Sequence, residues 1–209
     1  MTDSDPLDAR LSRVYRNPGD KQQLFDDWAG TYDHDLVNEL GYVADVETCK
    51  RFMQLVPEKH ARILDAGCGT GLVGRHLSAA GYRDLHGRDY SEGMLKQAAE
   101  SQVYRSLAQQ DLTQPIDTEA AFDAAVAVGV FAFSLPSAEH LVHLTNCLKP
   151  GGIATVTVNG KAWREVDWPK KLEDYDQRFP GSRLLAIETI DYLKTEGIDG
   201  RLLILQRGG

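Results

Sequence analysis

The sequence lacks several features that would identify a special class of protein. Its 209 residues include only three cysteines, Cys49, Cys68 and Cys147, and these show no metal-type spacing. No apolar run approaches the roughly 18 residues of a membrane span. The acidic N-terminus lacks the basic start and apolar stretch of a signal peptide. We therefore expect a protein of the reducing cytoplasm, with no bound metal and no membrane contact.

Positive charge is also scarce. The 23 Lys and Arg residues are outnumbered by 31 Asp and Glu residues, which gives a net charge of −8 and predicts no general attraction to nucleic acid. An apolar fraction of 42% and a length of 209 residues suit one globular domain with a full-sized core. No internal repeat or linker divides the chain, so we expect a single domain over residues 1–209. Both a monomer and a homodimer fit this expectation.

One glycine-rich stretch stands out, Ile63-Leu64-Asp65-Ala66-Gly67-Cys68-Gly69-Thr70-Gly71. The residues up to Ala66 read as a buried strand, and a helix is expected from Leu72 to Ala80. A strand, a tight glycine turn and a helix start together form a nucleotide-type binding element. Glycines let the ligand approach the backbone, and the helix start offers free N–H groups. The alternative is a bare strand-to-helix turn without a ligand.

The spacing in this stretch narrows the choice of ligand. Leu72 stands where a dinucleotide fingerprint has its last glycine, which opposes a nicotinamide oxidoreductase. No Lys-Ser/Thr pair follows Gly71, so the stretch is not a P-loop. The run from Asp65 to Gly71 instead resembles the first motif of the class I S-adenosylmethionine (SAM)-dependent methyltransferases. This resemblance implies SAM as the cofactor and S-adenosylhomocysteine as its product.

Strands and helices alternate along the rest of the chain and predict a Rossmann-like α/β fold with a mostly parallel sheet. The last two strands, Leu184–Tyr192 and Arg201–Gln206, resemble the antiparallel hairpin that closes the seven-stranded methyltransferase sheet. Residues 1–58 are expected to form a helical cap and residues 59–209 the SAM-binding core. The other expected strands are Arg62–Ala66, Leu85–Asp89, Tyr104–Gln109, Phe122–Val128 and Ile153–Val158, and the expected helices are Pro6–Tyr15, Asp20–Trp28, Tyr42–Val56, one capped by Ser91, one from Ser137 to Leu148 and one from Pro169 to Arg178.

Two acids follow expected strands, at the edge of the sheet where ligands bind in open α/β folds. Asp89 lies 24 residues after Asp65 and can accept both ribose hydroxyls of a nucleoside, and the resemblance to the family's second motif places Tyr90 and Met94 over adenine. Asp111 and the backbone N–H of Leu112 can read the edge of adenine. The alternatives are a helix-capping acid for the first position and a solvated loop carboxylate for the second.

The resemblance assigns further roles around the glycine stretch. Asp65 would order the loop and help to hold the methionine amino group, although a purely structural acid fits the sequence equally well. Cys68 reads as a small filler and not as a nucleophile. Val128, at the end of the fourth strand, would pass beside the sulfonium. The close approach of the cofactor would be allowed by Gly67, Gly69 and Gly71.

A motif in the expected cap points to the same ligand. Phe25-Asp26-Asp27-Trp28-Ala29-Gly30-Thr31-Tyr32-Asp33 is similar to the Tyr-Asp-x-x-Ala-x-x-Tyr-Asp pattern of small-molecule methyltransferases. By resemblance Tyr32 would touch the methionine part of SAM, with Trp28 in the same ligand-facing region. The alternative is a helix that packs its aromatic side chains on the sheet, as expected for Phe25. Together with Gly71-Leu72-Val73 and Gly93-Met94-Leu95, the motif resembles the subgroup formed by the methyltransferase-like protein of the Williams–Beuren region and its bacterial relatives.

These patterns predict a methyltransferase that acts on a small-molecule acceptor. Phe131, Phe133, Trp163 and Trp168 are candidate walls of the acceptor pocket, the last two within the polar segment 160–180. The alternatives are core packing for the two phenylalanines and packing of that segment against the domain for the two tryptophans. We name no catalytic residue, because methyl transfer from SAM can proceed through orientation alone, and only His34 among the six histidines falls in the cap. A protein acceptor and a non-catalytic SAM-binding regulatory module are the alternative functions.

Overall fold

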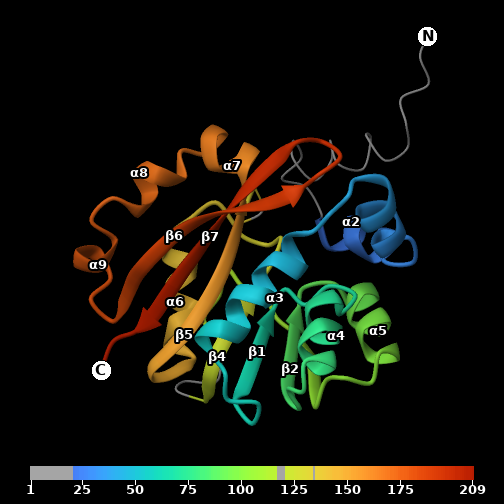
Figure 1. The fold of residues 1–209 in the computed structure, drawn as a ribbon, viewed down its shortest axis with the longest axis horizontal. Helices are drawn as coiled ribbons and strands as arrows, with labels where there is room; N and C mark the ends of the chain where they lie inside the picture. Colours follow the sequence, from blue (N-terminus) through green and yellow to red (C-terminus); the bar gives the residue numbers. More distant parts are fainter. Residues whose placement is uncertain (1–20, 117–120, 134) are drawn as a thin grey trace.

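A seven-stranded sheet forms the centre of the computed structural model, which describes residues 21–116, 121–133 and 135–209 (Figure 1). The strand order is β3-β2-β1-β4-β5-β7-β6. The strands are β1 (Arg62–Ala66), β2 (Asp84–Asp89), β3 (Ser106–Gln109), β4 (Phe122–Ala127), β5 (Leu148–Asn159), β6 (Ser182–Leu193) and β7 (Ile198–Arg207). The helices are α2 (Lys21–Trp28), the π-helical turn η1 (His34–Glu39), α3 (Ala44–Leu55), α4 (Leu72–Ala79), α5 (Glu92–Glu100), α6 (Glu139–Asn146), α7 (Gly160–Glu165), α8 (Trp168–Leu172) and α9 (Tyr175–Arg178).

The pairing of these strands confirms the Rossmann-like sheet that the sequence predicts. The strands β1 to β5 pair in parallel, and β7 then pairs antiparallel with both β5 and β6. The order reverses at β1, which lies between β2 and β4. In open α/β sheets such a reversal point, at the carboxyl ends of the strands, is where ligands bind.

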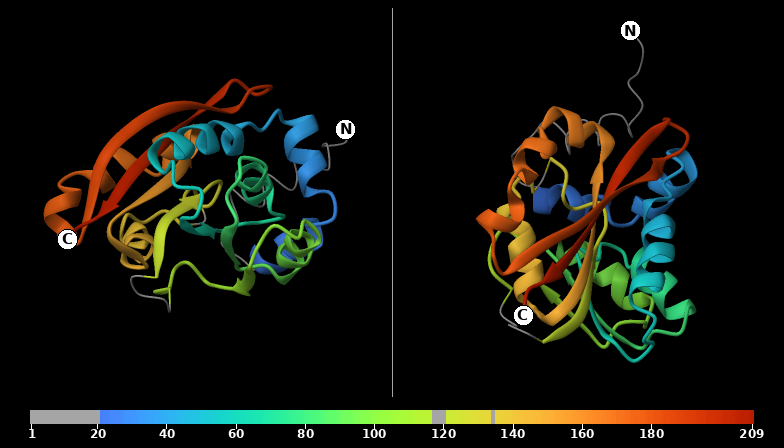
Figure 2. Two further views of the ribbon diagram at one scale, coloured as in Figure 1. Left: turned by 60° about the horizontal axis from the view of Figure 1, so that its bottom comes forward. Right: turned by 60° about the vertical axis from the view of Figure 1, so that its left-hand side comes forward.

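Both faces of the sheet are covered by helices. Neighbouring residues of a strand point to opposite faces: Ile63 packs with α3 and α4, whereas Leu64 packs in the cluster that contains α6, α7 and α8. Figure 1 shows α3, α4 and α5 side by side on one face, and the two views of Figure 2 show α6 on the other. The apolar residues of β1 and β4 are therefore buried from both sides.

The helices that precede β1 occupy two different places. The side chain of Asp26 in α2 contacts the start of α5, at the carboxyl end of β2. By contrast α3 lies along the sheet, where Cys49 and Phe52 join its core and Arg51 pairs with Glu188 of β6 at 2.8 Å. Among the described residues before β1, those from Lys21 to Glu39 thus cover the carboxyl edge of the sheet, and α3 covers a face.

Several expected boundaries are wrong. The expected helix Pro169–Arg178 is two helices, α8 and α9, because Asp174 between them adopts a left-handed conformation with φ of 52°. Leu148 belongs to β5 and not to the preceding helix, so this strand begins five residues before the expected Ile153 and has an irregular start. The two hairpin strands are longer than the expected Leu184–Tyr192 and Arg201–Gln206. The turn between them is only Lys194–Gly197, so Asp199 and Gly200 pair within the hairpin. The helix expected over Pro6–Tyr15 lies outside the described residues.

Candidate functional site

A cavity of about 360 Å³ opens at the carboxyl ends of β1, β2 and β4. Its walls come from five segments: residues 21–32, the glycine loop, and the segments that follow β2, β3 and β4. The lining residues are Lys21, Phe25, Tyr32, Gly67, Gly69, Asp89, Tyr90, Met94, Gln110, Asp111, Leu112, Thr113, Val128, Gly129, Val130 and Leu135. Its position at the strand-order reversal makes this cavity the candidate ligand site.

The glycine loop is held close to β2 and left open toward the cavity. The backbone N–H groups of Gly67 and Cys68 both donate to the carbonyl of Arg88, at 2.7 and 3.0 Å. Gly69 has a φ of +53°, and a Cβ built on it would meet no atom within 4 Å. A Cβ on Gly67 would overlap the side chain of Val130, which also lines the cavity. The loop therefore offers bare backbone to a ligand at Gly69.

Asp89 is the best-fixed polar group of the cavity. One carboxylate oxygen accepts the backbone N–H of Gly69 at 2.8 Å, and the other accepts that of Ser91 at 2.9 Å. Burial raises the pKa of Asp89, while these backbone donors act against the rise. Because an ionised carboxylate has about four acceptor sites, roughly two remain for a ligand. Two neighbouring hydroxyl donors match this capacity.

The loop after β3 forms the opposite wall. Asp111 accepts the backbone N–H and the hydroxyl of Thr113 at 2.9 and 2.7 Å, all on one carboxylate oxygen. The carbonyl of Leu112 lies 3.3 Å from Nδ1 of His143 on α6. These contacts fix the loop and leave the second oxygen of Asp111 free of the Thr113 bonds. His143 therefore supports this wall from α6.

Asp65 lies beneath the glycine loop and is 1% exposed. Its Oδ2 accepts the hydroxyl of Tyr104 at 2.6 Å. Desolvation by burial raises the pKa of Asp65 to about 7, and the negative charge of Asp89 adds to this rise. The carboxyl is thus poised between its two protonation states near neutral pH, but it does not line the cavity.

Aromatic residues of the cap segment close the cavity on its outer side. The ring of Tyr32 packs edge-on against Trp28, with centroids 4.9 Å apart, and Phe25 stacks on Trp28 at 6.5 Å. The indole N–H of Trp28 donates to Asp35 at 2.6 Å. Trp28 is 3% exposed and supports Tyr32 from behind, whereas Phe25 and Tyr32 face the cavity.

Nine of the residues that the sequence singles out line the cavity: Tyr32, Gly67, Gly69, Asp89, Tyr90, Met94, Asp111, Leu112 and Val128. Four others, Trp28, Asp65, Cys68 and Gly71, do not line it, although each neighbours a lining residue in space or along the chain. Burial raises the pKa of the Cys68 thiol well above its usual range, as suits a packing residue. The sequence reasoning missed Lys21, Gln110, Thr113, Gly129, Val130 and Leu135 and gave Phe25 only a packing role. Gln110 and Thr113 lie close to Asp111, and Gly129 and Val130 follow Val128. Their places just after the ends of strands could have identified them from the sequence.

The expected walls of an acceptor pocket are not at this cavity. Trp168 and Phe131 are completely buried in the core that covers one face of the sheet. Phe133 packs against the same core, and Trp163 lies in a surface hollow beside Leu184 and Ile187. The expectation for Trp168 and Phe131 is therefore wrong, because both side chains fill the interior. His34 pairs with its neighbour Asp35 and its side chain is 64% exposed.

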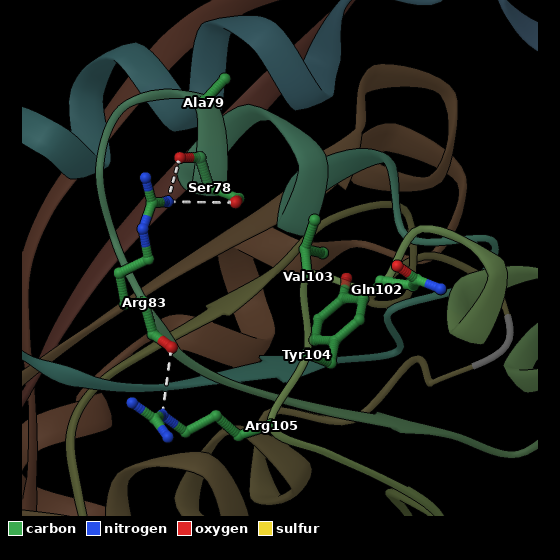
Figure 3. Close-up of a pocket in the computed structure, with 7 residues that line it drawn as sticks. All are labelled: Ser78, Ala79, Arg83, Gln102, Val103, Tyr104 and Arg105. Atoms are coloured by element: carbon green, nitrogen blue, oxygen red, sulfur yellow. Dashed lines mark hydrogen bonds between the residues drawn. The ribbon is translucent and has the colours of Figure 1, made fainter.

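A second hollow lies at the opposite end of the sheet, where α4 ends and β3 begins (Figure 3). Two of its seven lining residues are Arg83 and Arg105. Arg83 donates to the carbonyl and hydroxyl of Ser78, and Arg105 donates to the carbonyl of Arg83 at 3.2 Å. Figure 3 shows that these guanidinium groups face protein oxygens. They brace the turn between α4 and β2.

The strand order, the glycine loop after β1 and the fixed acid after β2 resemble those of class I SAM-dependent methyltransferases. The family's cofactor is SAM. Residues 63–152 match the family model described as a methyltransferase domain. This confirms the resemblance seen in the sequence.

Among known proteins, the chain is similar to human methyltransferase-like protein 27, with 35% identity over 158 residues, 71% of this chain and 62% of the human protein. It is 28% identical over 147 residues to the tRNA U34 carboxymethyltransferase of Methylococcus capsulatus, covering 65% of this chain and 44% of that enzyme. A SAM-dependent methyltransferase structure from Mesorhizobium loti has a TM-score of 0.59 at 19% identity, covering 76% of this chain and 96% of that one. The chain thus spans less than two thirds of both curated relatives.

No described helix has the length and apolar character needed to cross a membrane. Within the same residues, no three His, Cys, Asp or Glu side chains gather as metal ligands would.

Proposed function

We propose that this chain transfers a methyl group from SAM to a small-molecule acceptor. The observation that carries the proposal is Asp89, a half-buried carboxylate fixed by the N–H groups of Gly69 and Ser91 in the wall of a 360 Å³ cavity. A nucleoside ribose offers the two adjacent hydroxyl donors that this acid can still accept. The open backbone at Gly69 fits the close approach of such a ligand.

The remaining cavity residues divide by their chemistry. Tyr90 and Met94 supply apolar surface for the flat adenine ring, and Asp111 with the Leu112 N–H suits its polar edge. Val128 and Gly67 would border the methionine part, with Tyr32 closing over it. Trp28, Asp65, Cys68 and Gly71 would hold these groups in place from behind. Residues 21–39 would serve as the cap and the sheet as the binding core.

SAM, when bound, supplies an activated methyl group that is transferred by in-line displacement. The chain's own contribution is then to orient the acceptor and to exclude water, and orientation alone can supply roughly 7–11 kcal/mol. Phe25 and Tyr32 shield the cavity on its outer side. A neutral amine or an ionised oxygen or sulfur acceptor would need no protein base, and no histidine is among the lining residues.

The enclosing cap favours a small acceptor over a macromolecule. The relative from Methylococcus capsulatus is named for tRNA, but this chain carries a net charge of −8, which disfavours nucleic acid. The three cysteines are buried free thiols, in keeping with a reducing cytoplasm. A protein acceptor and a non-catalytic SAM-binding module are separated from this proposal by turnover with fractionated metabolites.

The first test is calorimetric titration with SAM, S-adenosylhomocysteine and NADH. We expect binding of the first two and none of NADH. Asp89→Ala should weaken both at least about 100-fold, because it removes the ribose acceptor and releases the Gly69 and Ser91 N–H groups. Glu92→Gln, an exposed acid three residues away, is the matched control and should bind as the wild type does. Failure of the wild type to bind SAM would overturn the proposal.

A further inference from the structure

Asp26, on α2, reaches across the cavity rim to the helix that follows β2. Its Oδ1 accepts the hydroxyl of Ser91 at 2.5 Å and the backbone N–H of Gly93 at 2.8 Å. A Cβ on Gly93 would come within 2.9 Å of the Asp26 backbone, so the glycine allows this close approach. An acid at the positive N-terminal end of α5 is also electrostatically favourable. The end of α2 nearest the cavity is thus fastened to the α5 start.

Asp33, seven residues later, makes a matching contact with the glycine loop. Its Oδ1 accepts the hydroxyl of Thr70, and its Oδ2 accepts the guanidinium of Arg75 at 2.5 Å. Arg75 also donates to the carbonyl of Thr70 at 2.9 Å. Thr70 lies between Gly69 and Gly71, so this acid holds the loop that offers bare backbone to the cofactor.

The two contacts belong to one continuous network around the cavity. Ser91, bound by Asp26, donates its backbone N–H to Asp89. Asp89 in turn accepts the N–H of Gly69, next to Thr70. The cap segment from Asp26 to Asp33 therefore connects the two loops that Asp89 already joins. Phe25 and Tyr32, which cover the cavity, each stand directly beside one of these acids.

We propose that Asp26 and Asp33 are positioning residues that fasten the cap to the two cofactor loops and thereby set how long SAM and its product stay bound. This inference rests on the proposed function. A ligand under Phe25 and Tyr32 leaves only when the cap moves away, and the cap moves only when these contacts break. Neither acid lines the cavity, so they act through the groups that they hold.

The test is the dissociation rate of S-adenosylhomocysteine, measured by stopped-flow fluorescence after mixing with excess SAM. Asp26→Ala and Asp33→Ala should each raise this rate by about tenfold or more, as expected for loss of hydrogen bonds to a charged group. The association rate and the fraction of binding-competent protein should stay within about twofold of the wild type. Asp27→Ala is the matched control, because Asp27 is exposed in the same motif and accepts a hydrogen bond from Gln23 within α2, away from both cofactor loops.

Asparagine variants distinguish a specific contact from a general structural role. Asp26 uses a single oxygen for both bonds, so Asp26→Asn keeps that acceptor and should recover most of the slow dissociation. Asp33 uses both oxygens, and an amide would set an N–H against Arg75, so Asp33→Asn should behave like Asp33→Ala. If the two acids served only a general structural role, Asp26→Asn and Asp33→Asn would change the dissociation rate equally.

The outcomes separate this inference from the proposed function. If the wild type binds and Asp26→Ala and Asp33→Ala dissociate no faster than Asp27→Ala, the inference is wrong and the proposed function stands. The inference is also wrong if the alanine variants contain a lower fraction of binding-competent protein but release S-adenosylhomocysteine at the wild-type rate. If the wild type binds neither SAM nor S-adenosylhomocysteine, the proposed function itself fails.

Discussion

At the scale of single residues, the pair formed by Asp65 and Tyr104 is the most informative. Asp65 is a completely buried acid whose pKa rises from an ordinary value of 3.8 to about 7, mainly through loss of solvation. Between these two values the unfolded chain has released the proton while the folded chain keeps it. The folded state then binds more protons, so this group lowers stability as pH rises from about 4 to about 7.

Asp65→Asn should remove that penalty and keep an acceptor for the Tyr104 hydroxyl. We expect the stability of the variant, relative to the wild type, to increase by about 1.4 kcal/mol per pH unit across this interval. Urea unfolding at pH 4.5, 5.5 and 6.5 measures the difference. Equal pH dependence of the two proteins would show that Asp65 is ionised throughout.

Asp123 supplies a control of opposite sign. Burial alone would raise its pKa, but the Lys149 ammonium at 2.6 Å and the Arg62 N–H lower it below the ordinary value. A depressed pKa contributes stability above the unfolded pKa and loses it as pH falls below that value. At neutral pH Asp123→Asn should therefore have a lower free energy of unfolding than the wild type, and this difference should disappear at acidic pH. For Asp65→Asn the difference has the opposite sign and grows as pH rises.

At the scale of elements, helix α4 is shaped by a side chain from outside it. Tyr104 precedes β3, and its ring lies against Gly71 and Gly74 before its hydroxyl reaches Asp65. A Cβ on Gly74 would overlap the Tyr104 hydroxyl. This explains why a residue that weakens helices stands inside α4.

Gly74→Ala should therefore destabilise the protein by about 1–3 kcal/mol through overpacking. Helix propensity alone predicts the opposite sign, a gain of about 1 kcal/mol. Chemical unfolding gives the answer, with Gly30→Ala as the control, since a Cβ there meets no atom within 4 Å. A stabilised Gly74→Ala variant would mean that Tyr104 can move aside.

At the scale of the whole molecule, the cap and the hairpin should respond differently to the cofactor. Saturating S-adenosylhomocysteine should slow amide exchange in residues 21–39, 67–71 and 89–94, which border the cavity. Exchange in the β6–β7 hairpin should stay unchanged, because none of its residues lines the cavity. At a ligand concentration of 100 Kd the folded state should gain about 2.7 kcal/mol. Protection spread evenly over the sheet would contradict this division.

The sequence by itself determined those features that depend on local chemistry. Glycines with positive φ and free helix N–H groups act over a few residues, so the turn from Asp65 to Gly71 could be identified directly. Asp89 followed from its place after an expected strand, and the closing hairpin from the resemblance of the last two expected strands to those of the methyltransferase sheet. For these reasons the fold and nine residues of the cavity wall could be predicted.

Only the tertiary structure decided which side chains meet across long stretches of chain. Trp168 fills the core because α8 lies over the sheet, and no local pattern distinguishes a core indole from a pocket wall. Asp26 reaches Ser91, and Asp33 reaches Arg75, across 65 and 42 residues. Such pairings depend on how the packed elements bring distant residues together, and no local sequence pattern records that arrangement.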